Sequence, residues 1–201
     1  MGEQLQVILG NDNAARKTAE ENIRKIRESE PDKYVTYLTT LCCDPAVDMQ
    51  VKTLAAVVLR RTLISYNEQS KMQLWEALKP ETKQGLKASL LESVPKVQNR
   101  DYVHKVSNLL VEIQGAMYEE NEEIWQELLH LVFQLVNSQE STIHVDAALQ
   151  TFNGLFSYII DHMNKHKEDL YLIFSKTLNH ADLDIKLAAL RAVSNYLETV
   201  E

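Results

Sequence analysis

Apolar side chains recur every three to four positions along almost the whole chain, with polar side chains between them. This spacing places the apolar residues of each segment on one face of an α-helix. Clear examples are the stripes Val35, Leu38, Leu41 and Cys42; Leu54, Val58 and Leu59; Trp125, Leu128, Leu129, Val132 and Val136; and Leu170, Ile173, Phe174 and Leu178. Each stripe is as long as an ordinary globular helix, and breaks separate the stripes. The pattern predicts an all-α protein.

Residues with helix-starting chemistry stand in the breaks. Candidate N-caps are Asp12, Asp44, Ser141 and Asp182, because their side-chain oxygens can accept hydrogen bonds from the first free N–H groups of a helix. Asp44 is followed by Pro45, which suits the first helical position. Pro31 and Pro80 are expected in the first turns of two other helices.

Together, the stripes and breaks predict five antiparallel helix pairs. The first helices are expected at about 2–9, 32–43, 81–95, 122–137 and 166–179. The second helices are expected at about 13–29, 46–64, 99–118, 141–163 and 183–200. With only five glycines and four prolines, the chain has too few turn residues for an all-β fold.

A short repeat recurs in the second helices. It consists of a small or aliphatic residue, a basic residue or histidine, a small residue three positions on, and usually an aliphatic residue four beyond that. The copies are Ala15-Arg16-Ala19-Ile23, Val51-Lys52-Ala55-Leu59, Val103-His104-Ser107-Val111, Ile143-His144-Ala147-Thr151 and Ile185-Lys186-Ala189-Val193, with Thr151 departing from the pattern. The central small residue is expected to be buried, because it lets its helix approach a neighbour closely.

Successive copies are 36, 52, 40 and 42 residues apart, counted between their basic or histidine positions. HEAT units have a length of about 40–47 residues. The long spacing indicates an insertion over 66–80. The sequence therefore predicts an α-solenoid of about five HEAT repeats, in which residues 1–201 form one domain without a linker.

The charge of the chain narrows the class of partner. The formal net charge is -8, which argues against nucleic acid, since phosphate binding needs a clustered basic face. It is compatible with basic protein partners, but an acidic surface that only keeps the chain soluble fits equally well. The run Glu119, Glu120, Glu122 and Glu123 has the same two interpretations, because acidic residues also favour the start of a helix.

Several kinds of chemistry find no support. The glycines never cluster, so no phosphate-binding loop can be drawn and no cofactor is expected. His162 and His166 share a helical spacing of four, but the glutamate of a metalloprotease motif is missing, and no metal is expected. Cys42 lies on an apolar stripe and is expected to pack in the core. Because Cys42 and Cys43 have no other cysteine with which to form a disulfide, they indicate a reducing compartment. No apolar run is long enough for a membrane span, and the chain is predicted to be a binding protein and not an enzyme.

Arg16, Lys52 and Lys186 lie beside the buried stripes, where they can either stabilise the fold or contact a partner. Lys52 and Lys186 each follow an aspartate by four residues, Asp48 and Asp182, which permits a local ion pair. Recurring polar residues can also pair between repeats, since a solenoid is held by its neighbour interfaces. Of the adjacent Arg60 and Arg61, at most one can lie centrally on any single helix face.

Five collinear segments carry a resemblance to a known family. The first is ILGNDNAARKTAEENIRKI, and the second is QVKTLAAVVLRRTLIS, with Arg16, Ala19 and Glu20 in the former and the Ala55–Arg61 run in the latter. WEALKPETKQGLKASLLESV, IWQELLHLVFQLVNSQ and HVDAALQTF follow. In this order they resemble the opening repeats of the importin-beta (karyopherin-beta) family, and most of all its importin-five (Ran-binding-protein-five) branch.

The resemblance implies a nuclear import receptor that is found in the cytoplasm, in the nucleus and at the nuclear pore. It also implies that this chain is the N-terminal part of that receptor. It implies that Ran-GTP binds the concave second helices, that Phe-Gly nucleoporins bind between first helices, and that cargo proteins with nuclear localisation signals bind mostly in later repeats. The residues expected to contact Ran are Arg16, Glu20, Arg24, Lys52, Thr53, Arg60, His104 and Asn108. The alternative is a HEAT scaffold subunit that organises an enzyme complex, such as a phosphatase.

Overall fold

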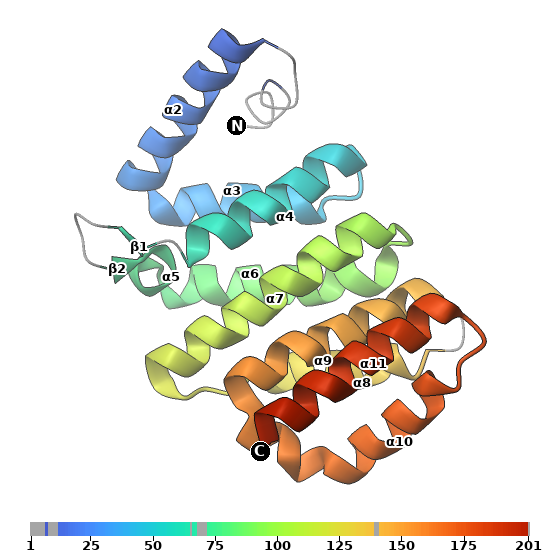
Figure 1. Cartoon of the computed structure of the whole chain (residues 1–201). Helices are drawn as coiled ribbons and strands as arrows, with labels where there is room; N and C mark the ends of the chain where they lie inside the picture. Colours follow the sequence, from blue (N-terminus) through green and yellow to red (C-terminus); the bar gives the residue numbers. More distant parts are fainter. Residues whose placement is uncertain (1–6, 8–11, 65, 68–71, 139–140, 201) are drawn as a thin grey trace. The chain divides into compact units, whose positions relative to one another are not determined.

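The computed structural model describes residue 7 and residues 12–64, 66–67, 72–138 and 141–200, and nearly all of them are helical (Figure 1). The chain divides into two compact units, Met1–Ser93 and Val94–Glu201. The prediction of one domain over 1–201 stays a prediction. The helix predicted at 2–9 lies, apart from Val7, outside the described residues.

The first unit contains five described helices and one short strand pair. Its elements are α2 (Asn13–Ser29), α3 (Pro31–Cys43), α4 (Met49–Leu63), β1 (Tyr66–Asn67), β2 (Met72–Gln73), α5 (Leu74–Ala77) and α6 (Pro80–Ser93). Helix α3 packs against α2, α4 and α6. The antiparallel pair β1–β2 and the single turn α5 occupy the predicted insertion between α4 and α6.

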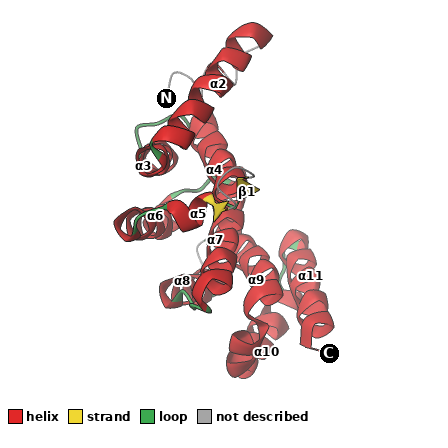
Figure 2. Ribbon diagram, turned by 90° about the vertical axis from the view of Figure 1, so that its left-hand side faces the viewer, coloured by secondary structure: helices red, strands yellow, loops and turns green. Residues whose placement is uncertain are grey.

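The described residues of the second unit form five long helices and two short 3₁₀ turns. Its elements are the turn Val94–Lys96, α7 (Arg100–Asn121), α8 (Gln126–Val136), α9 (Thr142–Met163), the turn Asn164–His166, α10 (Lys167–Leu178) and α11 (Leu183–Val200). Helices α7, α9 and α11 form one layer, and α8 and α10 form the other (Figure 2). In the described ranges, no helix is long and apolar enough to cross a membrane.

Most of the predicted helix starts are confirmed. Asp12 accepts hydrogen bonds from the N–H groups of Ala14 and Ala15, at 2.9 and 3.1 Å, and Ser141 caps α9. Pro31 and Pro80 are the first residues of α3 and α6. The start predicted at Asp44–Pro45 is wrong. Asp48, four residues after Asp44, caps α4 at 2.8 Å from the Gln50 nitrogen, whereas Asp44 ends α3.

The acidic run lies at the end of a helix and not at the start of one. Helix α7 continues to Asn121, so Glu119 and Glu120 belong to its last turn, where negative charge is not favoured by the helix dipole. The fully buried Gln114 fixes the turn that follows. Its amide donates to the Glu123 carbonyl and accepts from the Trp125 N–H, each at 2.8 Å. The dipole explanation is therefore wrong for Glu119 and Glu120, whereas Glu122 and Glu123 precede α8, which begins at Gln126 and not at the predicted residue 122.

The repeating small residues are buried, as predicted. The exposed fractions are 5% for Ala19, 2% for Ser107 and 0% for Ala55, Ala147 and Ala189. Within the second unit, glycines bring α7 and α9 even closer. A Cβ atom on Gly154 would lie 2.8 Å from a methyl carbon of Val111. The all-α HEAT-type fold class is confirmed, and its register follows from these small side chains.

Replacing Ala55 by leucine is expected to lower the free energy of unfolding by about 1–3 kcal/mol, because the added carbons have no space between α3 and α4. Gly85→Ala on α6 is the control. Nothing lies within 4 Å of its added Cβ, so it should be neutral or stabilising by about 0.4–1 kcal/mol. Urea unfolding of both variants measures the difference. Equal stability of the two would contradict the assigned packing.

Candidate functional site

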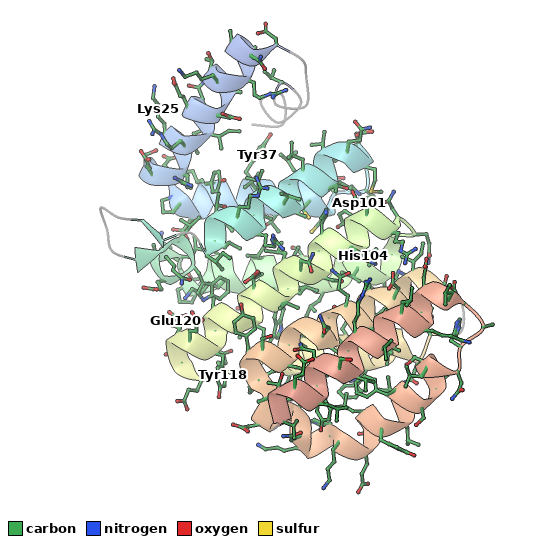
Figure 3. The ribbon with its side chains drawn as sticks, viewed as in Figure 1. Lys25, Tyr37, Asp101, His104, Tyr118 and Glu120 are labelled. Carbon is green, nitrogen blue, oxygen red and sulfur yellow. The ribbon has the colours of Figure 1, made fainter. Side chains whose placement is uncertain are left out.

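A row of polar side chains follows the second helices of the second unit. On α7 it starts with residues at a spacing of four, Arg100, His104, Asn108 and Glu112. This spacing keeps them on one side of the helix. Figure 3 shows His104 in the N-terminal half of α7, with Tyr118 near its other end. Each of these four residues is paired with a side chain on α9.

The bonds between helices form a ladder. Gln150 donates to the side-chain oxygen of Asn108 at 2.8 Å, and Tyr158 donates to Glu112 at 3.2 Å. From α11, Asn195 donates to the carbonyl of Asn153 at 2.6 Å. Polar residues therefore join neighbouring repeats, but these bonds involve other residues than Lys52 and Lys186, for which the sequence left that role open.

Asp146 on α9 is the central acceptor of this ladder. Its Oδ2 atom lies 2.9 and 2.7 Å from two guanidinium nitrogens of Arg100 and 2.8 Å from Nε2 of His104. Arg100 also binds Asp184 of α11 at 2.7 Å, so one arginine ties three second helices together. We call Arg100, His104, Asp146 and Asp184 the ionic clasp.

Electrostatics favour the charged form of the clasp. Burial alone would raise the pKa of Asp146, but hydrogen bonds from His104 and Arg100 outweigh it, and the pKa lies below its usual value. The two aspartates raise the pKa of Arg100 through hydrogen bonds. The side chain of Asp146 is 9% exposed, whereas those of Arg100 and Asp184 are 49% and 56% exposed. The clasp thus has a buried centre and a solvent-facing rim.

A hollow of about 380 Å³ opens beside the ionic clasp. Its lining residues are Arg100 and His104 from α7, Asp146, Gln150 and Asn153 from α9, and Asp184, Leu187, Ala188 and Arg191 from α11. We call it the polar slot. It lies wholly within the second unit, on the side of the second helices. A second hollow, of about 710 Å³ and mostly apolar, lies between α10 and α11.

Two of the predicted Ran-contacting residues, His104 and Asn108, belong to this row. Both are half-buried and already paired with α9, to Asp146 and Gln150. The sequence prediction missed Arg100, Asp146 and Asp184. One signal was available, since Asp146 follows the repeat position His144 by two residues. His144 itself is buried and bonds to the Val97 carbonyl at 3.1 Å.

Three predicted residues lie on α2 in the first unit. Arg16 is half-buried, and Glu20 and Arg24 are exposed. Their spacing of four places them along one side of the helix. Arg24 forms an exposed ion pair with Glu28 at 3.8 Å. Such a pair contributes little to stability, so Arg24 is available to a partner at small cost.

The other three predicted residues lie on α4. Lys52 is only 4% exposed, and Thr53 donates to the Met49 carbonyl at 2.8 Å. Arg60 is half-buried and Arg61 exposed, so one of the two lies closer to the core. In the described residues, no ion pair joins Lys52 to Asp48, and none joins Lys52, Thr53 or Arg60 to the residues of α2.

Buried Lys52 lies near the cysteines. Cys42 is fully buried, as predicted, and both cysteines are free thiols. A hydrogen bond with Cys42 is the main cause of a lowered pKa at Cys43, and the charge of Lys52 adds to it. Within the described ranges, no cluster of three or more His, Cys, Asp or Glu residues could hold a metal ion. Because Lys52 is buried beside the cysteines, its side chain is less accessible to a partner than the sequence suggested.

Two family models match adjacent parts of the chain. The model described as "Importin-beta N-terminal domain" matches residues 19–96, and the one described as "IPO5-like, TPR repeats" matches residues 98–201. No curated protein sequence matches the chain significantly. The second family model alone covers more than half of the chain. The chain belongs to the importin-beta family of nuclear transport receptors, whose members shuttle between cytoplasm and nucleus through the nuclear pore.

Solved structures of importin-beta proteins share the fold. Yeast importin-beta, Kap95p, superposes with a TM-score of 0.81 at 16% identity, over 99% of this chain and 24% of its own. Kap121p superposes with a TM-score of 0.77 at 20% identity, over 98% of this chain and 18% of its own. The chain thus spans about a quarter of Kap95p and less than a fifth of Kap121p. At these identities the likeness establishes the fold.

Several similar structures contain partners. In one, Kap95p binding induces the switch loops of RanGDP to adopt the GTP-bound conformation; this Kap95p superposes with a TM-score of 0.78 at 18% identity, over 99% of this chain and 23% of its own. Others contain Kap95 with Nup1, Kap121p with Pho4p and Kap121p with Nup53p. These partners belong to those proteins.

Proposed function

We propose that this chain binds Ran in its GTP-bound form through its second helices and takes part in protein transport through the nuclear pore. The observation that carries the proposal is the family match over residues 19–96 and 98–201. The related Kap95p acts on the switch loops of Ran, which are the parts that differ between nucleotide states. A transport receptor is favoured over the phosphatase-type scaffold for the same reason.

The polar second helices supply suitable contacts. In the second unit, the half-exposed side chains of Arg100 and Asp184 place hydrogen-bond donors and acceptors at the polar slot. In the first unit, Glu20 and Arg24 are exposed on α2, and Arg60 is half-buried on α4. Partly buried arginines are frequent hot spots at protein interfaces. We propose Arg60 as the first residue to test.

Cargo proteins and Phe-Gly nucleoporins are further proposed partners. The complexes of Kap121p with Pho4p and of the two receptors with Nup53p and Nup1 support these classes. Most of the cargo surface is expected outside residues 1–201, in line with the resemblance. The proposed localisation is cytoplasm, nucleus and nuclear pore.

Residues 1–201 are expected to bind Ran-GTP at least about tenfold more tightly than Ran-GDP, a difference of about 1.4 kcal/mol. Arg60→Ala is expected to weaken the GTP complex by about 2 kcal/mol, because truncating a hot-spot arginine leaves partner groups unpaired. Isothermal calorimetry with both nucleotide forms measures both effects. The control is Arg61→Ala, its exposed neighbour on α4.

The outcomes separate the function from the residue. Equal affinity for the two nucleotide forms would remove Ran-GTP recognition from this chain. GTP selectivity with an unaffected Arg60→Ala variant would keep the function and reject Arg60 as a hot spot. Arg61→Ala should change neither affinity beyond about 0.5 kcal/mol, since exposed rim charges contribute little.

A further inference from the structure

The polar slot contains hydrogen-bond acceptors to which no described residue of the protein donates. All three contacts of Asp146 fall on Oδ2, so its Oδ1 accepts none from the described residues. Asp184 likewise uses Oδ2 for Arg100 and has no bond at Oδ1 there. Gln150 uses its Nε2 for Asn108, which leaves its Oε1 unmatched in the described part of the chain.

Asp146 makes this arrangement unusual. Its side chain is only 9% exposed, and the residue lines the slot. A buried carboxylate normally has both oxygens satisfied, because desolvation without a hydrogen bond is costly. Oδ1 of Asp146 is not among the fully buried side-chain atoms of the described residues that lack a hydrogen bond, so it is open to the slot, where a ligand that brings donors can replace solvent. The carboxylate is already held in place by His104 and Arg100, so it needs no reorganisation to accept one.

We propose that the polar slot receives one basic side chain of a protein partner, whose ammonium or guanidinium group donates to Oδ1 of Asp146, Oδ1 of Asp184 and Oε1 of Gln150. This inference deepens the proposed function, since it rests on the second helices being the partner-binding surface. Asp146, Asp184 and Gln150 would then belong to the partner-binding interface. A volume of about 380 Å³ is large enough for a single lysine or arginine side chain.

The two arginines and two aspartates of the slot lining balance in charge, so the open acceptors and not the net charge of the lining favour a cation over an anion. Arg100 is held by Asp146 and Asp184, so these three residues together carry one net negative charge. Arg191 is the cation that could instead attract a carboxylate, and it is exposed on α11. The free acceptors lie on the inner residues, whereas Arg191 can turn into solvent on its long, flexible side chain. The net charge of -8 also favours a basic partner.

The slot can be tested without Ran. The probe is the peptide acetyl-Gly-Lys-Gly-amide, titrated into isotope-labelled protein while the side-chain amide signals of Gln150 and Asn153 are followed by NMR. Saturable shifts are expected with this peptide and none with acetyl-Gly-Glu-Gly-amide. Asp184→Asn should lower the affinity for the lysine peptide by about tenfold, as expected for the loss of one charge-assisted hydrogen bond. Asp101→Asn, an exposed carboxylate on α7 outside the slot, is the matched control.

Arg191→Ala distinguishes the two signs of ligand. This variant should bind the lysine peptide with equal or higher affinity, because it removes a positive charge that repels the lysine. Shifts with the glutamate peptide that disappear in Arg191→Ala would overturn the proposal, as would the absence of shifts with either peptide.

The same variants in calorimetry with Ran-GTP connect the slot to the proposed function. We expect Asp184→Asn to bind Ran-GTP with lower affinity than the parent chain, and Asp101→Asn to bind it with the same affinity as the parent. If the parent chain binds no Ran, the Ran proposal fails, and the peptide titration still decides the slot. If the parent binds Ran and Asp184→Asn binds equally well, the slot is not part of that interface and the inference is overturned.

Discussion

Asp146→Ala is expected to lower the free energy of unfolding by about 2–3 kcal/mol. Removing one partner of a buried ion pair typically costs 3–5 kcal/mol, because the other charge remains without compensation. The effect here is expected to be smaller, since Arg100 keeps its bond to Asp184 and is half-exposed. Urea unfolding followed by circular dichroism measures the loss. Asp184→Ala is the control and should cost no more than about 1 kcal/mol, because its side chain is 56% exposed.

The same prediction has a pH dependence. The pKa of Asp146 is lowered in the folded protein, so the unfolded chain takes up its proton first as the pH falls. Its stabilising contribution is therefore complete above the unfolded pKa of about 3.9 and disappears as the pH falls through the folded value. The stability difference between the parent and Asp146→Asn should be full at neutral pH and shrink below about pH 4. A difference that stays constant down to pH 3 would contradict the clasp.

The positions of the helices could be predicted from the sequence because they depend on local periodicity. The helix predicted at 13–29 is observed at those residues, and the one at 183–200 likewise. Errors occurred where two residues had the same chemistry. Asp44 and Asp48 can both cap a helix, and only the packing of α4 decides that Asp48 does. The strand pair in the insertion gave no periodic signal, since each strand has two residues.

The site could be predicted only in part, because its bonds join distant residues. Arg100 and Asp146 are 46 positions apart, and Arg100 and Asp184 are 84 apart. The repeat located the second helices and two members of the polar row, His104 and Asn108. It could not say which polar residue of one helix faces which residue of the next, since that depends on the register between helices. The burial of Lys52 is a second case of this kind.

The largest loss is expected from a residue that joins the fourth and fifth helix pairs. Phe156 on α9 is fully buried, and its ring centroid lies 5.2 Å from that of Tyr196 on α11 and 6.4 Å from that of Phe174 on α10. Edge-to-face contacts of this kind add to the burial of apolar area. Removing the ring would leave a cavity at the point where the last pair packs on its neighbour.

Phe156→Ala is expected to destabilise the protein by about 3–5 kcal/mol, and Phe156→Leu by no more than about 1.5 kcal/mol, because leucine refills most of the space. Since each repeat contacts only its neighbours, the damage should be local. Amide hydrogen exchange should accelerate in α10 and α11 and stay unchanged in α3 and α4 of the first unit. Tyr171→Ala, 71% exposed on α10, is the neutral control. Because α11 carries Asp184 and Arg191, Phe156→Ala should also abolish binding of the lysine peptide, whereas Phe156→Leu should preserve it. Uniformly faster exchange throughout the chain would show instead that the repeats unfold as one unit.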